Sequence, residues 1–567
     1  MSKKNFIVKR ILICGIAAAL AVSVSGCSLF QGDESSDAKQ NSSESNTSET
    51  TQAAGASKFG NDIAVKSKSY NITLPIMTYL FNYNYKSYVD NYGTYMTYYG
   101  FDSTKDLKEQ YYNEESGQTW YDYFMDMTKQ YIEQTLIMAE AAKENGVELD
   151  ESDNKTIEET ITSLQSAASA NSQTAEQYIS SYYGSGVTES DIRECLKLTT
   201  LAQKYYNQLH DGYKYTDEDY EKFYEENKTS YLYADFLSFS FDFTAETVSG
   251  EESAEVSVNA EEKQKAKSYA EDLAKCKTAE EFKDYITKYL KANPDLVHTE
   301  SSAASDESSA ETSVSEKELD AAIQTQVDAA LTSKYTYEVT SEAGKWVFED
   351  GRKQNETKII EGTDNYTVIM MVKPAYRDES INKNVRHILL STETYGTEDK
   401  AKAKADEVYA EWKKGDKTED SFAKLAEKYS SDPGSSNNGG LYENVSEGQM
   451  VTEFNDWVFD KSRKKGDTGI VKTSYGYHIM YFSGDSDAAW KVSVDSAMRT
   501  QDYQKDYEAL QKKFTIEFDD DYLKNIDVFV SSSSEAAEST AQSAAGTSTE
   551  SKAQSAAESS AESKSKS

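Results

Sequence analysis

The sequence predicts a multidomain α+β protein, with one helical domain followed by two related domains of strands and helices. Three observations support this prediction. Residues 59–230 show the three- and four-residue apolar spacing of helices, residues 231–485 alternate strand and helix patterns, and this second region contains an internal repeat. Low-complexity segments rich in Ser, Glu and Ala flank these parts, and we expect them to be disordered.

The helical region 59–230 is marked by apolar stripes and by helix boundaries. Between Phe124 and Met138, large or apolar side chains recur every three or four residues, and Gly146 is expected to end that helix. The segment 191–208 repeats the pattern, and Thr216 is expected to cap the next helix. We interpret the stripes as packed core. The chain has 42 tyrosines, and tyrosine-lined helices are suited to offer an amphipathic surface to unfolded peptides.

The internal repeat is a long match without gaps. Residues 346–371 align with residues 457–482 at a constant offset of 111, so that Trp346 meets Trp457 and Arg352 meets Arg463. Each copy opens with a strand, followed by a helix and then a second helix. We therefore predict two copies of one domain, an antiparallel sheet with flanking helices, at 231–375 and 382–485. The apolar positions of the first helix are Ala266, Ala270 and Leu273 in one copy and Ala401, Ala405 and Val408 in the other.

Composition excludes some classes of function. The chain has 567 residues and a formal net charge of −38, which argues against nucleic-acid binding because phosphate recognition depends on Lys and Arg. No CxxC pair points to a metal or redox site. Two of the four cysteines, Cys195 and Cys276, fall in helical sequence and could form one disulfide. The segments 27–58, 299–317 and 531–567 are predicted to be disordered, and 490–530 is predicted as a C-terminal helix returning to the helical domain.

The first 27 residues have the order of an export signal. A basic stretch ends at Arg10, an apolar run from Ile11 to Val24 follows, and the run is too short to span a bilayer. Val24-Ser25-Gly26-Cys27 resembles the bacterial lipobox. This resemblance implies that residues 1–26 are a cleaved lipoprotein signal peptide and that lipid on Cys27 holds the protein at the outer face of the cell membrane. The alternative is an ordinary secretory signal with an incidental cysteine.

The second copy carries an ordered set of motifs. They are VRHILL around His387, SFAKLAEKYSSDPGS leading to Asp432, NGG at 438–440, EGQMVTEF with Met450 and Phe454, and SYGYHIM ending near His478. Over about a hundred residues this set resembles the parvulin family of peptidyl-prolyl isomerases. Two of the four histidines in the chain fall on the family's two histidine positions. The whole layout is similar to the PrsA-type foldase lipoproteins of Gram-positive bacteria, with a helical region like the chaperone region of SurA and PrsA proteins.

The resemblance implies a set of site residues. Leu441, Met450 and Phe454 would form an apolar cup for the proline ring. His387 and His478 would form a hydrogen-bonded pair that stays neutral, with Asp432 beside it and Ser430 in the same network. Isomerisation of an X–Pro bond makes or breaks no covalent bond, so neither a nucleophile nor a metal or other cofactor is expected. The alternative is that the histidines are a purely structural polar pair.

One motif departs from the family pattern. Parvulins commonly have Gly-Gly-Asp-Leu-Gly where this chain has Gly439-Gly440-Leu441-Tyr442-Glu443. With Leu441 aligned to the family leucine, Gly440 replaces the acid and Tyr442 replaces a glycine, so we expect a different loop backbone at the rim of the pocket.

The first copy lacks the candidate groups. The offset puts Thr367 where His478 stands, and alignment of the opening strands puts Phe236 opposite His387, so we predict no isomerase activity there. The leading interpretation is an extracytoplasmic foldase that isomerises X–Pro bonds in secreted proteins and holds unfolded chains. The alternatives are a non-catalytic holdase with two inert parvulin domains and a surface-binding lipoprotein. Whether the helical domains form a homodimer stays open.

Overall fold

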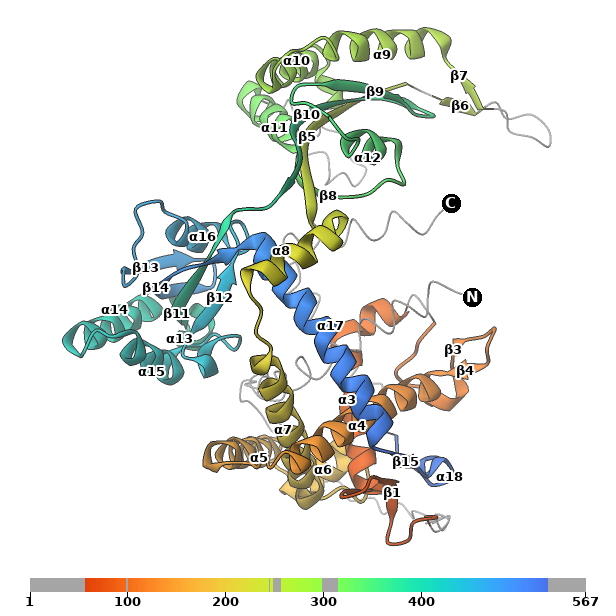
Figure 1. Ribbon diagram of the computed structural model, residues 1–567, viewed down its shortest axis with the longest axis vertical. Coiled ribbons are helices and arrows are strands. Elements are labelled where there is room, and N and C mark those ends of the chain that lie inside the picture. Colours follow the sequence, from red (N-terminus) through yellow and green to blue (C-terminus); the bar gives the residue numbers. More distant parts are fainter. Residues whose placement is uncertain (1–56, 98–99, 244, 248–255, 298–314, 529–567) are drawn as a thin grey trace, which may run out of the picture. The chain divides into compact units, whose positions relative to one another are not determined.

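The computed structural model describes two compact units (Figure 1). The described residues are 57–97, 100–243, 245–247, 256–297 and 315–528. The first unit joins the chain up to Lys214 to the chain from Arg499 onward, and the second runs from Tyr215 to Met498. The predicted signal segment, Cys27, His298 and the tail 531–567 lie outside the described residues.

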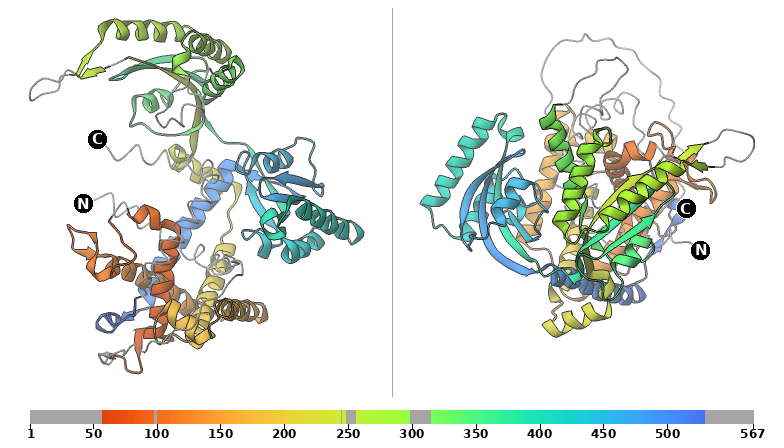
Figure 2. Two further views of the ribbon diagram at one scale, coloured as in Figure 1. Left: turned by 180° about the vertical axis from the view of Figure 1, so that it is seen from behind. Right: turned by 90° about the horizontal axis from the view of Figure 1, so that it is seen from above.

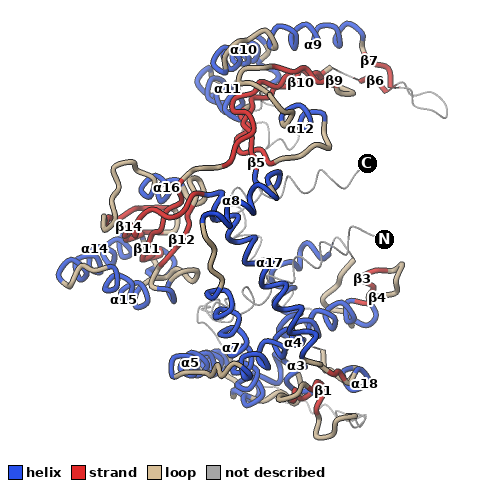
Figure 3. Tube along the Cα trace, viewed as in Figure 1, coloured by secondary structure: helices blue, strands red, loops and turns tan. Residues whose placement is uncertain are grey.

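The first unit is mainly helical, as Figure 3 shows by colour. Its long helices α4 and α7 bury the apolar stripes seen in the sequence, and Phe124, Ile132 and Leu136 have no exposed surface. Helix α4 ends at Glu144, and Gly146 follows with φ of 69°, which confirms the predicted helix end. The elements are β1 (Ile63–Lys66), β2 (Asn71–Thr73), α3 (Leu74–Thr97), β3 (Tyr111–Asn113), β4 (Gln118–Thr119), α4 (Trp120–Glu144), α5 (Glu151–Ala170), α6 (Ala175–Tyr183) and α7 (Glu189–Gly212).

The two ends of the first unit correct the predicted boundaries. The tether was expected to extend through residue 58, but the Ser57 hydroxyl and the Lys58 amide both donate to the Asp519 carboxylate, at 3.2 and 2.6 Å. The predicted C-terminal helix over 490–530 ends earlier, because α17 covers Ala489–Lys513. The chain then forms β15 (Glu517–Phe518), which pairs with β1, and α18 (Asp520–Leu523), because Phe514 and Leu523 are buried in this unit.

Helix α8 (Asp217–Glu226) belongs to the second unit and not to the helical domain predicted for 59–230. Thr216 caps it as expected, with its side chain accepting a hydrogen bond from the Asp219 amide. The helix leaves the first unit because Tyr224 is buried against Trp490 at the start of α17, with ring centroids 5.6 Å apart.

The second unit holds two four-stranded antiparallel sheets of the same topology. Their strand orders are β8-β5-β10-β9 and β12-β11-β14-β13. In the first copy, α9 to α11 cover one face of the sheet and α12 the other (Figures 1 and 2). Its elements are β5 (Leu232–Asp242), β6 (Ala245–Thr247), β7 (Val256–Val258), α9 (Ala260–Leu273), α10 (Ala279–Ala292), α11 (Glu316–Ala329), β8 (Leu331–Thr336), α12 (Glu342–Val347), β9 (Thr357–Glu361) and β10 (Asn365–Arg377).

The second copy repeats this order. Its elements are β11 (Ile381–Ser391), α13 (Thr392–Tyr395), α14 (Glu398–Lys414), α15 (Glu419–Tyr429), β12 (Leu441–Val445), α16 (Thr452–Val458), β13 (Thr468–Thr473) and β14 (Gly476–Ala488). The predicted repeat is confirmed down to single hydrogen bonds. The Met371 amide donates to the backbone carbonyl of Glu356, and the Phe482 amide donates to that of Asp467, each at 2.9 Å. The donors and the acceptors of these two bonds are both 111 residues apart.

Two other predictions are decided by the described residues. The disordered loop was expected to extend to residue 317, but Ser315 caps α11 through a hydrogen bond with Glu318, so the helix begins at Glu316. Cys195 and Cys276 are both free thiols. Within the described ranges, no helix combines the length and apolarity needed to cross a bilayer.

Candidate active site

The two motif histidines of the second copy lie next to each other on the central strands of its sheet. His387 stands on β11 opposite Met480, and His478 stands on β14 opposite Leu389, so both side chains are on one face. Their Nδ1 atoms are 3.0 Å apart and their rings are nearly parallel, at an interplanar angle of 18°. Both are buried, with 3% and 5% of their surface exposed. The sequence therefore predicted this pair correctly as a contact.

Asp432 reaches the pair from the loop that follows α15. Its Oδ2 lies 2.9 Å from His387 Nε2 and also accepts hydrogen bonds from the Ser435 hydroxyl and, at 3.0 Å, from the Tyr442 hydroxyl. The backbone fixes this loop against β11, because the Ser431 amide donates to the Leu389 carbonyl and the His387 amide donates to the Gly440 carbonyl. The carboxylate is thus held in one position by three side-chain donors.

A single set of tautomers satisfies every contact of the pair. The Thr473 hydroxyl lies 2.9 Å from His478 Nε2 and can donate to it, while its oxygen accepts the Tyr475 amide. His478 Nδ1–H then donates to His387 Nδ1, and His387 Nε2–H donates to Asp432. In this arrangement both imidazoles are neutral, and all four ring nitrogens are engaged inside the site.

Burial and charge set the protonation of these groups. Burial would raise the pKa of the Asp432 carboxyl, but the hydrogen bonds from His387, Ser435 and Tyr442 hold it well below its usual value. Burial, together with the positive charge that a protonated His387 would present, lowers the pKa of His478 to about 3. Burial and the Asp432 charge raise the pKa of Tyr442. At neutral pH the site therefore holds a carboxylate, a neutral His478 and a protonated phenol.

The lowered pKa of His478 predicts that its imidazole resonance does not shift between pH 8 and 5. In the unfolded chain this imidazole binds a proton below about pH 6.5, but in the folded domain it does so only near pH 3. The free energy of unfolding is therefore not reduced by this group above pH 6.5. Between pH 6.5 and 3 it decreases by about 1.4 kcal/mol for each pH unit, because the unfolded chain binds the proton and the folded domain does not. In a protein labelled with ¹³C at histidine, the resonance absent from H478Q should not shift between pH 8 and 5. A midpoint near 6.5 would contradict the assignment.

An apolar wall lies against the histidines. Phe454 on α16 is 3% exposed, and its ring stands edge-on to both imidazoles, with centroid distances of 5.5 Å to His387 and 5.6 Å to His478. Met450 packs in the same cluster and is half-buried. Tyr442 belongs to it as well, with its ring 5.3 Å from His387. Phe454 and Met450 are therefore placed as the sequence predicted.

The structure corrects Leu441, the third predicted cup residue. Leu441 pairs with Arg386 and Tyr442 pairs with Val385, and partners that stand opposite each other share a face of the sheet. Arg386 belongs to the face covered by α15, where it contacts Glu419, so Leu441 points away from the histidines. Tyr442 takes the place expected for Leu441. A shift of one residue in the strand changes the face of every side chain, which is why the motif alignment assigned the wrong neighbour.

Ser430 is also placed differently from the prediction. Its hydroxyl oxygen accepts hydrogen bonds from the Leu389 amide, at 3.1 Å, and from the Asp432 amide, at 3.3 Å, and so it shapes the loop without touching either imidazole. Ser435, which is 1% exposed, is the serine that contacts both His387 and Asp432. Ser435 and Thr473 were missed, although both lie within or next to the quoted motifs.

Gly440 has a left-handed backbone conformation that residues with a Cβ adopt only at a cost in free energy. Its φ is +72°, and a Cβ there would lie 2.1 Å from the His387 carbonyl oxygen. We predict that G440A destabilises the domain by about 2–4 kcal/mol, because strain and the clash add. Thermal unfolding should show this loss. The matched control is G448A, since Gly448 has φ of +85° but no atom within 4 Å of the added Cβ. An equal loss for both variants would refute the close-contact explanation.

The first copy has none of these groups. Thr367 stands at the position of His478, as predicted. The position of His387 is taken by Ser238 and not by Phe236, because Ser238 pairs with Ile369 as His387 pairs with Met480. Phe236 is equivalent to Val385 and packs against Tyr335, at 5.2 Å between ring centroids. The scaffold is kept without the histidine pair.

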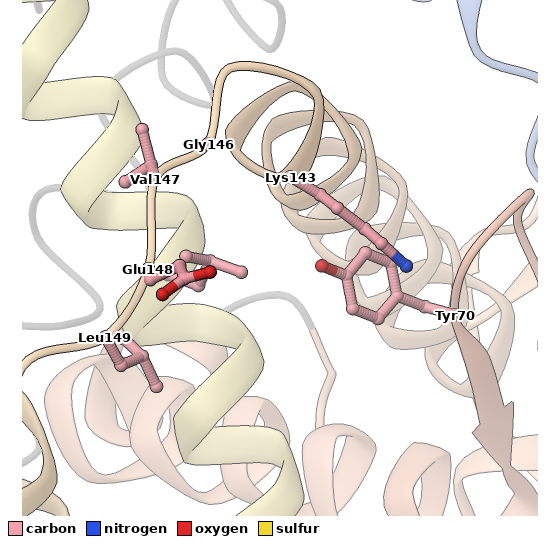
Figure 4. Close-up of a pocket in the computed structure, with 7 residues that line it drawn as sticks. Tyr70, Lys143, Gly146, Val147, Glu148 and Leu149 are labelled. Atoms are coloured by element: carbon pink, nitrogen blue, oxygen red, sulfur yellow. The ribbon is translucent and has the colours of Figure 1, made fainter.

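Other parts of the described chain do not add to this site. A cavity of about 300 Å³ in the first unit is lined by Tyr70, Lys143, Gly146, Val147, Glu148, Leu149 and Leu201. Figure 4 shows the Lys143 side chain beside the Tyr70 ring at one side of this cavity. None of the predicted site residues lines it. Among the described residues, no cluster of three or more His, Cys, Asp or Glu side chains is arranged to hold a metal ion.

Comparison with known proteins covers the same region. Residues 369–484 match the family described as the PPIC-type PPIase domain. The second α+β domain of this chain is a PPIC-type PPIase domain. The match begins within β10 of the first copy and ends within β14 of the second. The histidine network described above falls wholly within the matched residues.

Two curated relatives align with part of this chain. Foldase protein PrsA 1 of Listeria innocua is 36% identical over 109 residues, which cover 19% of this chain and 33% of the relative. Foldase protein PrsA of Geobacillus kaustophilus is 38% identical over 129 residues, covering 23% and 36%. The chain thus spans about a third of the length of these relatives. A solved structure, a peptidylprolyl isomerase (PrsA) from Bacillus cereus, is 20% identical, with 61% of this chain and 91% of that chain covered and a TM-score of 0.16.

Proposed function

We propose that this chain is a foldase that isomerises X–Pro bonds in newly secreted polypeptides and holds them while they are unfolded. The observation that carries the proposal is the buried pair of His387 and His478, fixed by Asp432 and lying against Phe454, within a PPIC-type domain. An apolar wall beside a rigid polar network is what rotation about an amide bond needs, because the twisted amide is less polar than the planar one.

The geometry favours a mechanism without proton transfer. All four imidazole nitrogens have partners inside the site, so none is left to exchange a proton with the substrate. Asp432 is tied by three side-chain donors and is a poor nucleophile. We infer that Phe454, Met450 and Tyr442 hold the proline ring. The histidine network would then act as a preorganised set of dipoles that favours the twisted amide.

Refolding of a client protein separates the proposed foldase from the alternative functions. Refolding of an exported protein whose slow phase is set by a trans-to-cis proline should be accelerated by the intact chain, since the uncatalysed step takes tens of seconds. A holdase with inert domains would reduce aggregation without changing the rate of the slow phase. A surface-binding lipoprotein would do neither, so the three functions give different results.

Attachment to the membrane is the remaining part of the proposal. Lipid on Cys27, after cleavage behind Gly26, would hold the protein at the outer face of the cell membrane, because two acyl chains anchor stably. We predict that C27S moves the protein from the membrane fraction to the soluble extracytoplasmic fraction. C276S, at a cysteine of the second unit, is the control and should stay with the membrane. If C27S stays membrane-bound, the lipobox interpretation is wrong.

A further inference from the structure

A connected row of aromatic rings crosses three elements of the helical unit. Tyr92 and Tyr88 of α3 are 5.0 Å apart between ring centroids, Tyr88 is 5.9 Å from Tyr123 of α4, and Tyr123 stacks at 4.3 Å on Tyr112 of strand β3. We call these four residues, with Tyr95 one turn beyond Tyr92 on α3, the tyrosine row. It is separate from the isomerase site and belongs to the unit that contains α3 and α4 (Figure 1).

The row packs on the core of the unit on one side and is exposed on the other. Tyr123 and Tyr112 contact Trp120, which is buried with Phe124 in the core of the unit. On the outer side Tyr92, Tyr95 and Tyr112 expose 54%, 59% and 41% of their surface. They are three of the five exposed tyrosines among the described residues. Exposed rings gathered on one surface, rather than scattered singly, are typical of a binding surface.

The charged residues near the row are mostly acidic, which favours a basic partner. Between Gly100 and Asp126 the chain has seven acidic residues and only two basic ones, Lys105 and Lys108. Both lysines are engaged nearby, Lys105 with Asp102 at 3.1 Å and Lys108 over the Tyr121 ring at 4.4 Å. Glu114 and Glu115 at the tip of the β3–β4 hairpin are exposed. The surface therefore combines exposed aromatic rings with an excess of negative charge.

Both features attract the same chemistry. Ammonium and guanidinium groups bind the faces of aromatic rings and are drawn to acidic surroundings. This unit already shows such a contact, since Lys86 Nζ lies 3.3 Å from the centroid of the Tyr182 ring. A row of rings, unlike a round patch, suits an extended chain whose side chains recur along its length. We propose that the tyrosine row binds unfolded polypeptide segments rich in Lys, Arg and aromatic residues. This inference rests on the proposed foldase function and names the segments that it would hold.

The test uses two proline-free peptides and the full-length chain. One fluorescent peptide alternates Lys with Phe and Tyr, and the other has Glu in place of every Lys. We expect the basic peptide to bind at least tenfold more tightly than the acidic one, with an affinity that falls as salt increases. The triple variant Y92S/Y95S/Y112S should weaken basic-peptide binding at least tenfold. Y475S removes a comparably exposed tyrosine of the second unit and should bind as the wild type does.

A second variant covers the case in which the triple variant does not fold. E114K/E115K changes only exposed residues of the hairpin, and it should reverse the preference toward the acidic peptide. The proposal is overturned if neither peptide binds, if both bind equally, or if the tyrosine variants bind like the wild type. It is also overturned if the row is covered by a second copy, so that the wild type sediments as a dimer and the triple variant as a monomer. Because the peptides contain no proline, loss of isomerase activity would leave these results unchanged.

Discussion

H478A should lower kcat/KM for a short X–Pro peptide by roughly 10²-fold, a size typical of removing one preorganised hydrogen-bonding group from a site. Without His478, His387 Nδ1 loses its donor and Thr473 loses its acceptor, so the tautomers are no longer fixed. The measurement is protease-coupled isomerisation, with circular dichroism to show that the domain stays folded.

The control for this prediction is a histidine outside the site. His210 lies on α7 of the helical unit, and H210Q should keep the activity of the wild type. H387A should be about as inactive as H478A, and the double variant little worse, because residues that act as one unit are not additive. If H478A keeps more than half of the activity, the pair is structural and does not contribute to rate.

F454A should have the second-largest effect, and it should act on both stability and activity. Phe454 is buried against both imidazoles, and truncating a buried Phe to Ala costs about 3–5 kcal/mol. The apolar wall would also be lost, so KM for the X–Pro peptide should increase even where the domain remains folded. F454L should restore most of both, because it refills the volume.

A buried phenylalanine on the other face of the sheet separates these two effects. Phe422 on α15 has no exposed surface and packs on the helix-covered side. F422A should lose a similar amount of stability, yet KM should not change below its melting temperature. Equal increases in KM for F422A and F454A would mean that Phe454 contributes to the fold alone.

The sequence predicted the parts of the fold that depend on repeated local chemistry. The offset of 111 between Trp346 and Trp457 predicted which strands and turns of the two copies would match. In the structure Arg352 and Arg463 make the same hydrogen bond to the carbonyl of the preceding tryptophan, at 3.0 Å in each copy. The histidine pair was predicted by motif and by the scarcity of histidines. Neither inference required knowledge of how distant segments pack.

Three errors concern features that only the folded chain fixes. Leu441 was chosen over Tyr442, Ser430 over Ser435, and Phe236 over Ser238, and each choice depends on strand pairing or loop path. A shift of one residue moves a side chain to the other face of the sheet, and a shift of two moves it along the same face. The serine that reaches the histidines is set by the path of the loop after α15. The Tyr442 hydroxyl on Asp432 could not be foreseen, because it needs the register and the loop together.

The domain boundaries were misplaced for a different reason. Composition alone set the predicted end of the tether at residue 58 and of the internal loop at 317. However, Ser57 is held by Asp519, more than 400 residues away in the chain, and Ser315 is a helix cap. Composition does not distinguish a polar residue that caps a helix or bonds to a distant segment from one that makes no such contact. Tertiary contact decides between them.

The measurement that bears most directly on the proposed function is the cis–trans exchange rate of a short X–Pro peptide, followed by NMR with the intact chain at substoichiometric concentration. We predict exchange far faster than the uncatalysed tens of seconds, increasing in proportion to protein concentration. The H387A/H478A double variant should show none of this acceleration. Exchange with the wild-type chain that is no faster than in buffer would contradict the isomerase function.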